Sequence, residues 1–105
     1  MTEPDVVRVA AEHARRLAAG DAGALDDIAP GASVEPPDLL HGLLIERFGR
    51  FDVVAHARIG AYHIFKTKLV GSRTVVVQAR WAQDAAGRWR IAEAEVARVA
   101  SQPDP

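Results

Sequence analysis

The sequence predicts an α+β domain in which helices cover the concave face of a curved, mostly antiparallel sheet. Two observations carry this prediction. Apolar residues before Phe51 recur at helical spacing, whereas apolar and polar residues alternate after it, as they do in strands. Helices that precede a run of consecutive strands are typical of this fold class. The 105 residues, 49% of them hydrophobic, are expected to form a single domain, 1–105, with a core over about 5–99 and a loose tail over 100–105.

The first helix is expected to be capped by Thr2 and to end at Gly20. Its apolar residues lie on one stripe, and His13 is the titratable group within that stripe. The spacing therefore predicts that His13 points into the interior. The stripe consists of Val6, Val9, Ala10, His13, Ala14 and Leu17.

Two further helices are expected before the main sheet. Asp21 is placed to cap a short one that extends to about Ile28, and a short strand over 32–35 follows it. The next helix covers about 38–48 and is apolar almost all round. Gly42 interrupts it, so its start is expected either at the beginning of this range or at the glycine itself.

Four strands complete the sequence. In the first of them the odd positions are apolar, so His56 and Arg58 are expected on the polar, outer side. In the last strand the apolar positions switch parity, which predicts a bulge near Ala92. The four strands are expected over 51–59, 62–70, 74–83 and 89–99.

Two segments carry a resemblance to a known family: GDAGALDDIAPGASVEPP after the first helix and GRWRIAEAEVARV at the end. With them, the chain resembles the NTF2-like superfamily over about residues 5–99. That superfamily contains ketosteroid isomerases, SnoaL-type polyketide cyclases, enzymes similar to limonene-epoxide hydrolase, and many non-enzymatic modules. The resemblance implies a cystatin-like cone with three helices on the sheet and an apolar cavity at its open end.

The residues that serve isomerase chemistry in that family are mostly missing. The position of the carboxylate base corresponds to Pro36, that of the oxyanion-binding tyrosine to His13, and that of the second oxyanion donor to Ala79. The water-activating carboxylates of the epoxide hydrolases are also hard to assemble, since Arg80 and Asp84 lie on the polar side of their strand. Isomerisation by the family mechanism is therefore not expected.

The remaining candidates for chemistry are His13 and His63, since a neutral imidazole facing a cavity can donate a hydrogen bond or relay a proton. The alternative for His13 is an ordinary interior histidine bonded to a backbone carbonyl. His63 is expected to face the helices and Tyr62 to face outward, and the inverse assignment stays open because both parities of their strand contain apolar residues. The residues expected to bind a ligand are His13, His41, Tyr62, His63, Phe65, Ala79 and Trp81.

Several classes of site and partner are not expected. The chain has no cysteine, and the spacing of its histidines matches no metal motif, so neither a metal nor a cofactor is predicted. The net charge of −1 gives no attraction to nucleic acid. Neither a signal peptide nor a membrane-spanning run is evident, which favours a cytoplasmic protein without a membrane partner.

Two functions remain open. The chain is expected to bind a small hydrophobic metabolite, with its transformation left open; the alternative is a non-catalytic dimerising module. A homodimer through the outer face of the sheet is expected in either case. A cavity with two convergent polar groups favours the first, and a filled core favours the second. The outer face is expected to carry His56, Arg58, Lys66, Lys68, Gln78, Arg80 and Arg90, opposed by Glu93 and Glu95.

Overall fold

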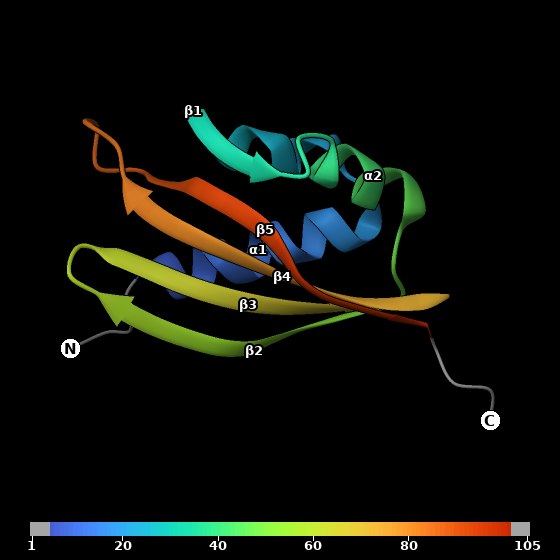
Figure 1. The fold of residues 1–105 in the computed structure, drawn as a ribbon. Helices are drawn as coiled ribbons and strands as arrows, with labels where there is room; N and C mark the ends of the chain where they lie inside the picture. The colour runs from blue at the N-terminus through green and yellow to red at the C-terminus, as the bar shows by residue number, and fades with distance from the viewer. Residues whose placement is uncertain (1–4, 102–105) are drawn as a thin grey trace.

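The computed structural model describes residues 5–101, and two α-helices and a 3-10 helix pack against one face of a five-stranded sheet (Figure 1). The helices are α1 (Asp5–Ala19), η1 (Ala22–Asp27) and α2 (Leu39–Glu46). The strands are β1 (Ile28–Glu35), β2 (Arg50–Ile59), β3 (Tyr62–Val70), β4 (Arg73–Gln83) and β5 (Trp89–Ser101). No helix within 5–101 is long and apolar enough to cross a membrane.

The α+β prediction is confirmed, and the sheet is mixed. Its strand order is β1-β5-β4-β3-β2, with β1 parallel to β5 and all other neighbours antiparallel. The parallel pair forms because the chain crosses from β1 over α2 and through the meander before it returns as β5. The predicted Thr2 cap and residues 102–105 of the predicted tail lie outside the described residues, while 100 and 101 extend β5.

The expectation of three N-terminal helices needs correction. The second segment is a six-residue 3-10 helix, η1, whose Asp21 cap accepts a hydrogen bond from the backbone of Gly23 at 2.8 Å. Ile28 already pairs with Ile91 in the sheet, so the chain has too few residues left for a longer helix. The third segment does form an α-helix, which begins at Leu39 and continues through Gly42.

The predicted bulge near Ala92 is present in β5. Arg80 pairs with Glu93, whereas the next residue, Trp81, pairs with Ile91, so Ala92 is the extra residue. The insertion brings Ile91 and Ala94 to the same face of the sheet, and both are buried there. The bulge therefore explains why the apolar positions of this strand change parity in the sequence.

A second bulge, in β2, overturns the expected outer placement of His56 and Arg58. Val53 pairs with Thr67 and Ala55 pairs with Lys66, so one residue is inserted between them and the faces exchange. His56 then lies opposite Phe65, and Arg58 lies opposite His63. We call the helix-covered face, which holds the buried side chains of His63, Phe65 and Leu69, the inner face, and the opposite one the outer face.

The space between the helices and the inner face is filled by two apolar clusters. Burial of this kind is the main favourable term in folding. One cluster lies below α2 and the end of α1, and consists of Leu17, Ala18, Ala24, Leu39, Leu40, Leu43, Phe48, Leu69, Val75 and Val77. The other lies below the first half of α1, and consists of Val6, Ala10, Phe65, Trp81, Ile91 and Ala94.

Candidate functional site

A small cavity lies between α1 and the inner face, where the sequence predicts a ligand pocket. Its volume is about 20 Å³, which is room for a single water molecule. Sites for small organic ligands usually have volumes of about 300–1,000 Å³. The cavity is lined by Ala10, His13, Ala14, Leu17, Leu40, Phe65, Thr67, Val77, Ala79, Trp81, Ile91 and Ala94.

His13 borders this cavity from the buried side of α1. Its Nδ1 lies 2.9 Å from Oδ2 of Asp27, and the two side chains are only 9% and 13% exposed. The imidazole also meets the indole of Trp81 edge-on, with the ring centroids 5.5 Å apart. His13 is therefore an interior histidine whose hydrogen-bond partner is a carboxylate, instead of the backbone carbonyl considered from the sequence.

The His13–Asp27 pair has the arrangement that orients a histidine for proton transfer. A carboxylate that accepts the Nδ1 proton fixes the tautomer and leaves Nε2 for a second partner. The adjoining cavity supplies space for one water molecule and for no organic substrate. The pair can therefore hold a buried water, whereas substrate chemistry would require α1 to move away from the sheet.

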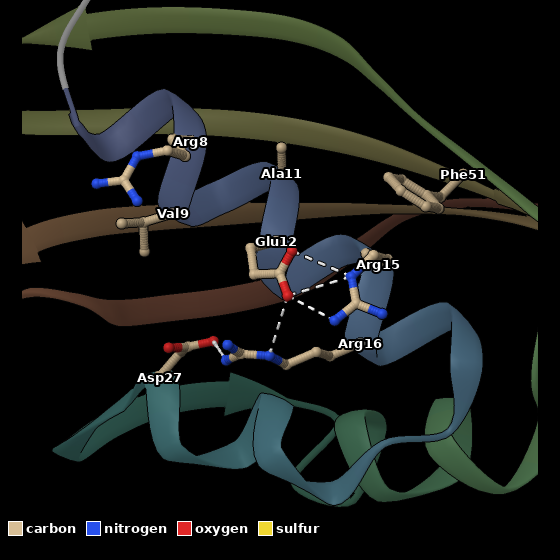
Figure 2. A pocket seen from close by; sticks show the side chains of 8 residues that line it. All are labelled: Arg8, Val9, Ala11, Glu12, Arg15, Arg16, Asp27 and Phe51. Carbon is tan, nitrogen blue, oxygen red and sulfur yellow. Dashed lines mark hydrogen bonds and ion pairs between the residues drawn. The ribbon is translucent and has the colours of Figure 1, made fainter.

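Asp27 also borders an open surface groove of about 750 Å³ along α1 (Figure 2). A guanidinium nitrogen of Arg16 lies 3.9 Å from its carboxylate, while the Nε of the same arginine lies 3.5 Å from Glu12. Arg15 donates to both oxygens of Glu12, and these hydrogen bonds hold the pKa of Glu12 below its ordinary range. These four charged side chains thus pair with one another along the groove, as charges on a solvated helix face do.

Apart from the contact between His13 and Trp81, a cluster of aromatic rings lies on the inner face of β2 and β3. Nε2 of His56 lies 2.8 Å from Nδ1 of His63. The His56 ring stacks on Phe65, with the centroids 4.1 Å apart and the planes 9° from parallel. The His63 ring meets Trp89 edge-on at 5.2 Å. These contacts fix both imidazoles in place.

The environment of His63 disfavours its charged form. Burial lowers the pKa of His63, and the nearby His56 and Arg58 lower it further by repulsion. The neutral form of His63 is therefore favoured, and its Nδ1 shares a hydrogen with Nε2 of His56.

The structure brings only some of the sequence-predicted site residues together. His13, Phe65, Ala79 and Trp81 line the small cavity. His63 lies on the same inner face, but it belongs to the aromatic cluster that it forms with His56 and Trp89. The remaining two residues, His41 and Tyr62, are elsewhere: His41 is exposed on α2, and Tyr62 lies on the outer face below the guanidinium of Arg80.

Two residues that the sequence did not suggest complete these clusters. Asp27 was missed because its contact with His13 depends on the chain reversal at Gly20, which no local pattern specifies. His56 was assigned to the wrong face. The alanines at 55 and 57 continue the alternation of the strand, but they are too small to show which face of the sheet they occupy. The adjacent valines at 53 and 54 are the one local sign of the bulge.

Residues 5–101 contain no group of three or more histidine, aspartate or glutamate side chains that could hold a metal ion. His56 and His63 face each other at hydrogen-bond distance, which leaves no space for an ion between them.

No protein-family model and no curated protein matches this sequence. The structure is similar to the crystal structure of an NTF-2 like protein of unknown function from Silicibacter pomeroyi DSS-3. The TM-score is 0.65 at 11% identity, and the match covers 90% of this chain and 92% of that one. The chain therefore has an NTF2-like fold, as the sequence motifs predicted. At this identity the similarity concerns the fold alone.

Proposed function

We propose that this protein is a dimerising NTF2-like module that binds a second copy of itself through the outer face of the sheet. The observation that carries this proposal is Arg80, at the centre of that face. Its Nε is buried and has no hydrogen-bond partner among the described residues. Its guanidinium lies over the ring of Tyr62, 4.7 Å from the centroid. A buried unpartnered donor is costly, and a carboxylate of a partner subunit that drew the guanidinium away from the Tyr62 ring would remove that cost.

The part of the outer face around Gln78 and Arg80 is divided by charge. The basic half lies on β3 and β4, and the acidic half lies on β5 and β1. A two-fold axis along the strands, between β4 and β5, would set the basic half of each protomer against the acidic half of the other. The basic residues there are Lys66 and Arg80, and the acidic residues are Glu93, Glu95 and Glu35. Beyond these positions the charges are mixed, since Lys68 lies opposite Asp52 and β5 carries Arg90 and Arg98 on the same face.

Apolar side chains adjoin these charges. Ile59 and Tyr62, at the β2–β3 hairpin, are 60% and 41% exposed. Ile64 and Val76, which share their face, are half-buried. A face with apolar side chains among paired charges is typical of interfaces between subunits. Arg58, which the sequence assigned to this face, is on the inner face and takes no part.

The test is sedimentation equilibrium of the wild-type chain and of charge variants. The wild type is expected to dimerise, and Arg80→Glu is expected to weaken the dimer. Glu93→Arg should weaken it alone and restore it in combination with Arg80→Glu. Arg88→Glu, in the exposed β4–β5 turn, is the matched control. A monomeric wild type at high concentration, or a dimer that Arg80→Glu leaves unchanged in a folded protein, would contradict the proposal.

The other function considered from the sequence, binding of a small hydrophobic metabolite beside His13, is less well supported. The buried His13–Asp27 pair favours it, since it would give a ligand a fixed hydrogen-bonding group. A cavity of about 20 Å³ opposes it. A ligand bound there would raise the melting temperature. It would first have to displace α1 from the sheet, so its binding would be slow.

A further inference from the structure

An open pocket of about 550 Å³ lies at one end of the sheet, apart from the cavity beside His13. The β2–β3 and β4–β5 hairpins and the start of α1 all lie toward this end (Figure 1). The pocket takes side chains from the four strands β2 to β5 and from the turn between β2 and β3. It is lined by His56, Arg58, Ala61, His63, Gln83 and Trp89.

The lining of this pocket carries positive charge and no acid. Arg58 donates from Nε to the backbone oxygen of Gly60, at 3.2 Å, and forms no ion pair within residues 5–101. Its terminal nitrogens are therefore available to a ligand. A guanidinium presents these donors in a plane that matches the two oxygens of a carboxylate.

The histidine pair supplies a second donor whose direction depends on the ligand. If His56 donates from Nε2 to Nδ1 of His63, the neutral His63 must carry its proton on Nε2. That nitrogen then donates to an acceptor in the pocket. In the opposite arrangement His63 Nε2 has no proton and would repel an anion. An anionic ligand would therefore select the first arrangement.

The pocket also offers aromatic surface. Trp89 lines it and is half-buried, and its contact with His63 holds the indole in place. The ring of Phe65 stacks on that of His56 and holds it in place. Rigid aromatic walls favour a planar, apolar ligand body.

We propose that this pocket binds a small aromatic carboxylate, with its carboxylate between Arg58 and Nε2 of His63 and its ring against Trp89. The site lies on the inner face, so the proposal goes beyond dimerisation through the outer face and does not depend on it.

The test is a titration of the full chain with benzoate, followed by NMR of the histidine rings and the indole N–H groups. The chain has four histidines. The signals of His56 and His63 are expected to shift together with that of Trp89, while those of His13 and His41 serve as internal references. Benzyl alcohol, acetate and inorganic phosphate are the comparison probes, and each is expected to bind at least about tenfold more weakly than benzoate.

Arg58→Gln is expected to weaken benzoate binding about tenfold, because it removes a charge-assisted pair of hydrogen bonds. Arg50→Gln, at the other end of the same strand, is the matched control and should change binding by less than about twofold. Both arginines are exposed, so both variants should fold. Phosphate or acetate binding as tightly as benzoate would overturn the aromatic part of the proposal. Equal effects of the two variants, or no shift at His56 and His63, would overturn the site.

Discussion

Nδ1 of His13 and Oδ2 of Asp27, 14 residues apart in the sequence, lie 2.9 Å from each other in the interior. The contact joins α1 to η1 beside a cavity large enough for one water molecule. It is a polar contact in a mostly apolar space between helix and sheet, where Thr67 also borders the cavity.

Loss of His13 should therefore reduce stability. His13→Ala leaves the buried Asp27 carboxylate without its donor and should lower the free energy of unfolding by about 1–3 kcal/mol. His13→Gln retains an N–H donor and should preserve most of the stability. Urea denaturation measures both. His41→Ala, on the exposed side of α2, is the control and should have little effect. An equal loss of unfolding free energy in His13→Ala and His41→Ala would show that the buried pair stabilises the fold no more than an exposed histidine does.

Large side chains at the centre of the two clusters should dominate the stability. Trp81 and Leu43 are almost fully buried, so Trp81→Ala and Leu43→Ala should each cost about 2–5 kcal/mol. Leu44, on the same helix as Leu43, is only half-buried and should cost less. Arg15→Ala, on the solvent side of α1, provides the reference for a surface change. Chemical denaturation that ranks these variants in another order would contradict the packing.

Two glycines should respond to alanine in opposite directions. Gly20 has a φ of +76°, and a Cβ there would lie 2.9 Å from the backbone oxygen of Leu44. Gly20→Ala should therefore destabilise the protein by about 1–2 kcal/mol. Gly42 lies within α2 and has open space around it, so Gly42→Ala should stabilise by about 0.5–1 kcal/mol. Melting temperatures that move in the same direction would be inconsistent with these backbone conformations.

Asp84 should make the β4–β5 turn sensitive to acid. Its Oδ1 accepts hydrogen bonds from the backbone N–H groups of Arg88 and Ala86, both at 2.9 Å. These hydrogen bonds hold the pKa of Asp84 below its ordinary value of 3.8, and the bond from Arg88 has the larger effect. The folded state thus favours the carboxylate, and this stabilisation is complete above the unfolded pKa and is lost as the pH falls through the folded one.

The measurement for Asp84 is the difference in unfolding free energy between the wild type and Asp84→Ala. The wild type should be more stable at pH 7, and its advantage should shrink in strong acid. An advantage that is constant with pH would show that the charge of the carboxylate is not involved.

The periodicity of the chain was enough to predict the inward face of α1, the strand meander and the bulge near Ala92. These features depend on neighbours one to four residues apart, because a helix repeats every 3.6 residues and a strand every two. The inward position of His13 and Trp81 follows from the same rule. The motifs at 20–37 and 87–99 then predicted the NTF2-like fold, although they did not identify a function.

Other features were decided by tertiary contacts. The residue inserted between Val53 and Ala55 moves His56 and Arg58 to the inner face, and the neighbouring alanines are too small to show which side they prefer. The partner of His13, Asp27, depends on a chain reversal, and the volume of the cavity depends on how α1 settles on the sheet. The sequence by itself determined the order of the elements and the inward faces of α1 and β4, since these follow from local periodicity. Only the tertiary structure decided which polar groups meet and how much space remains between them, because both depend on register and packing between distant segments.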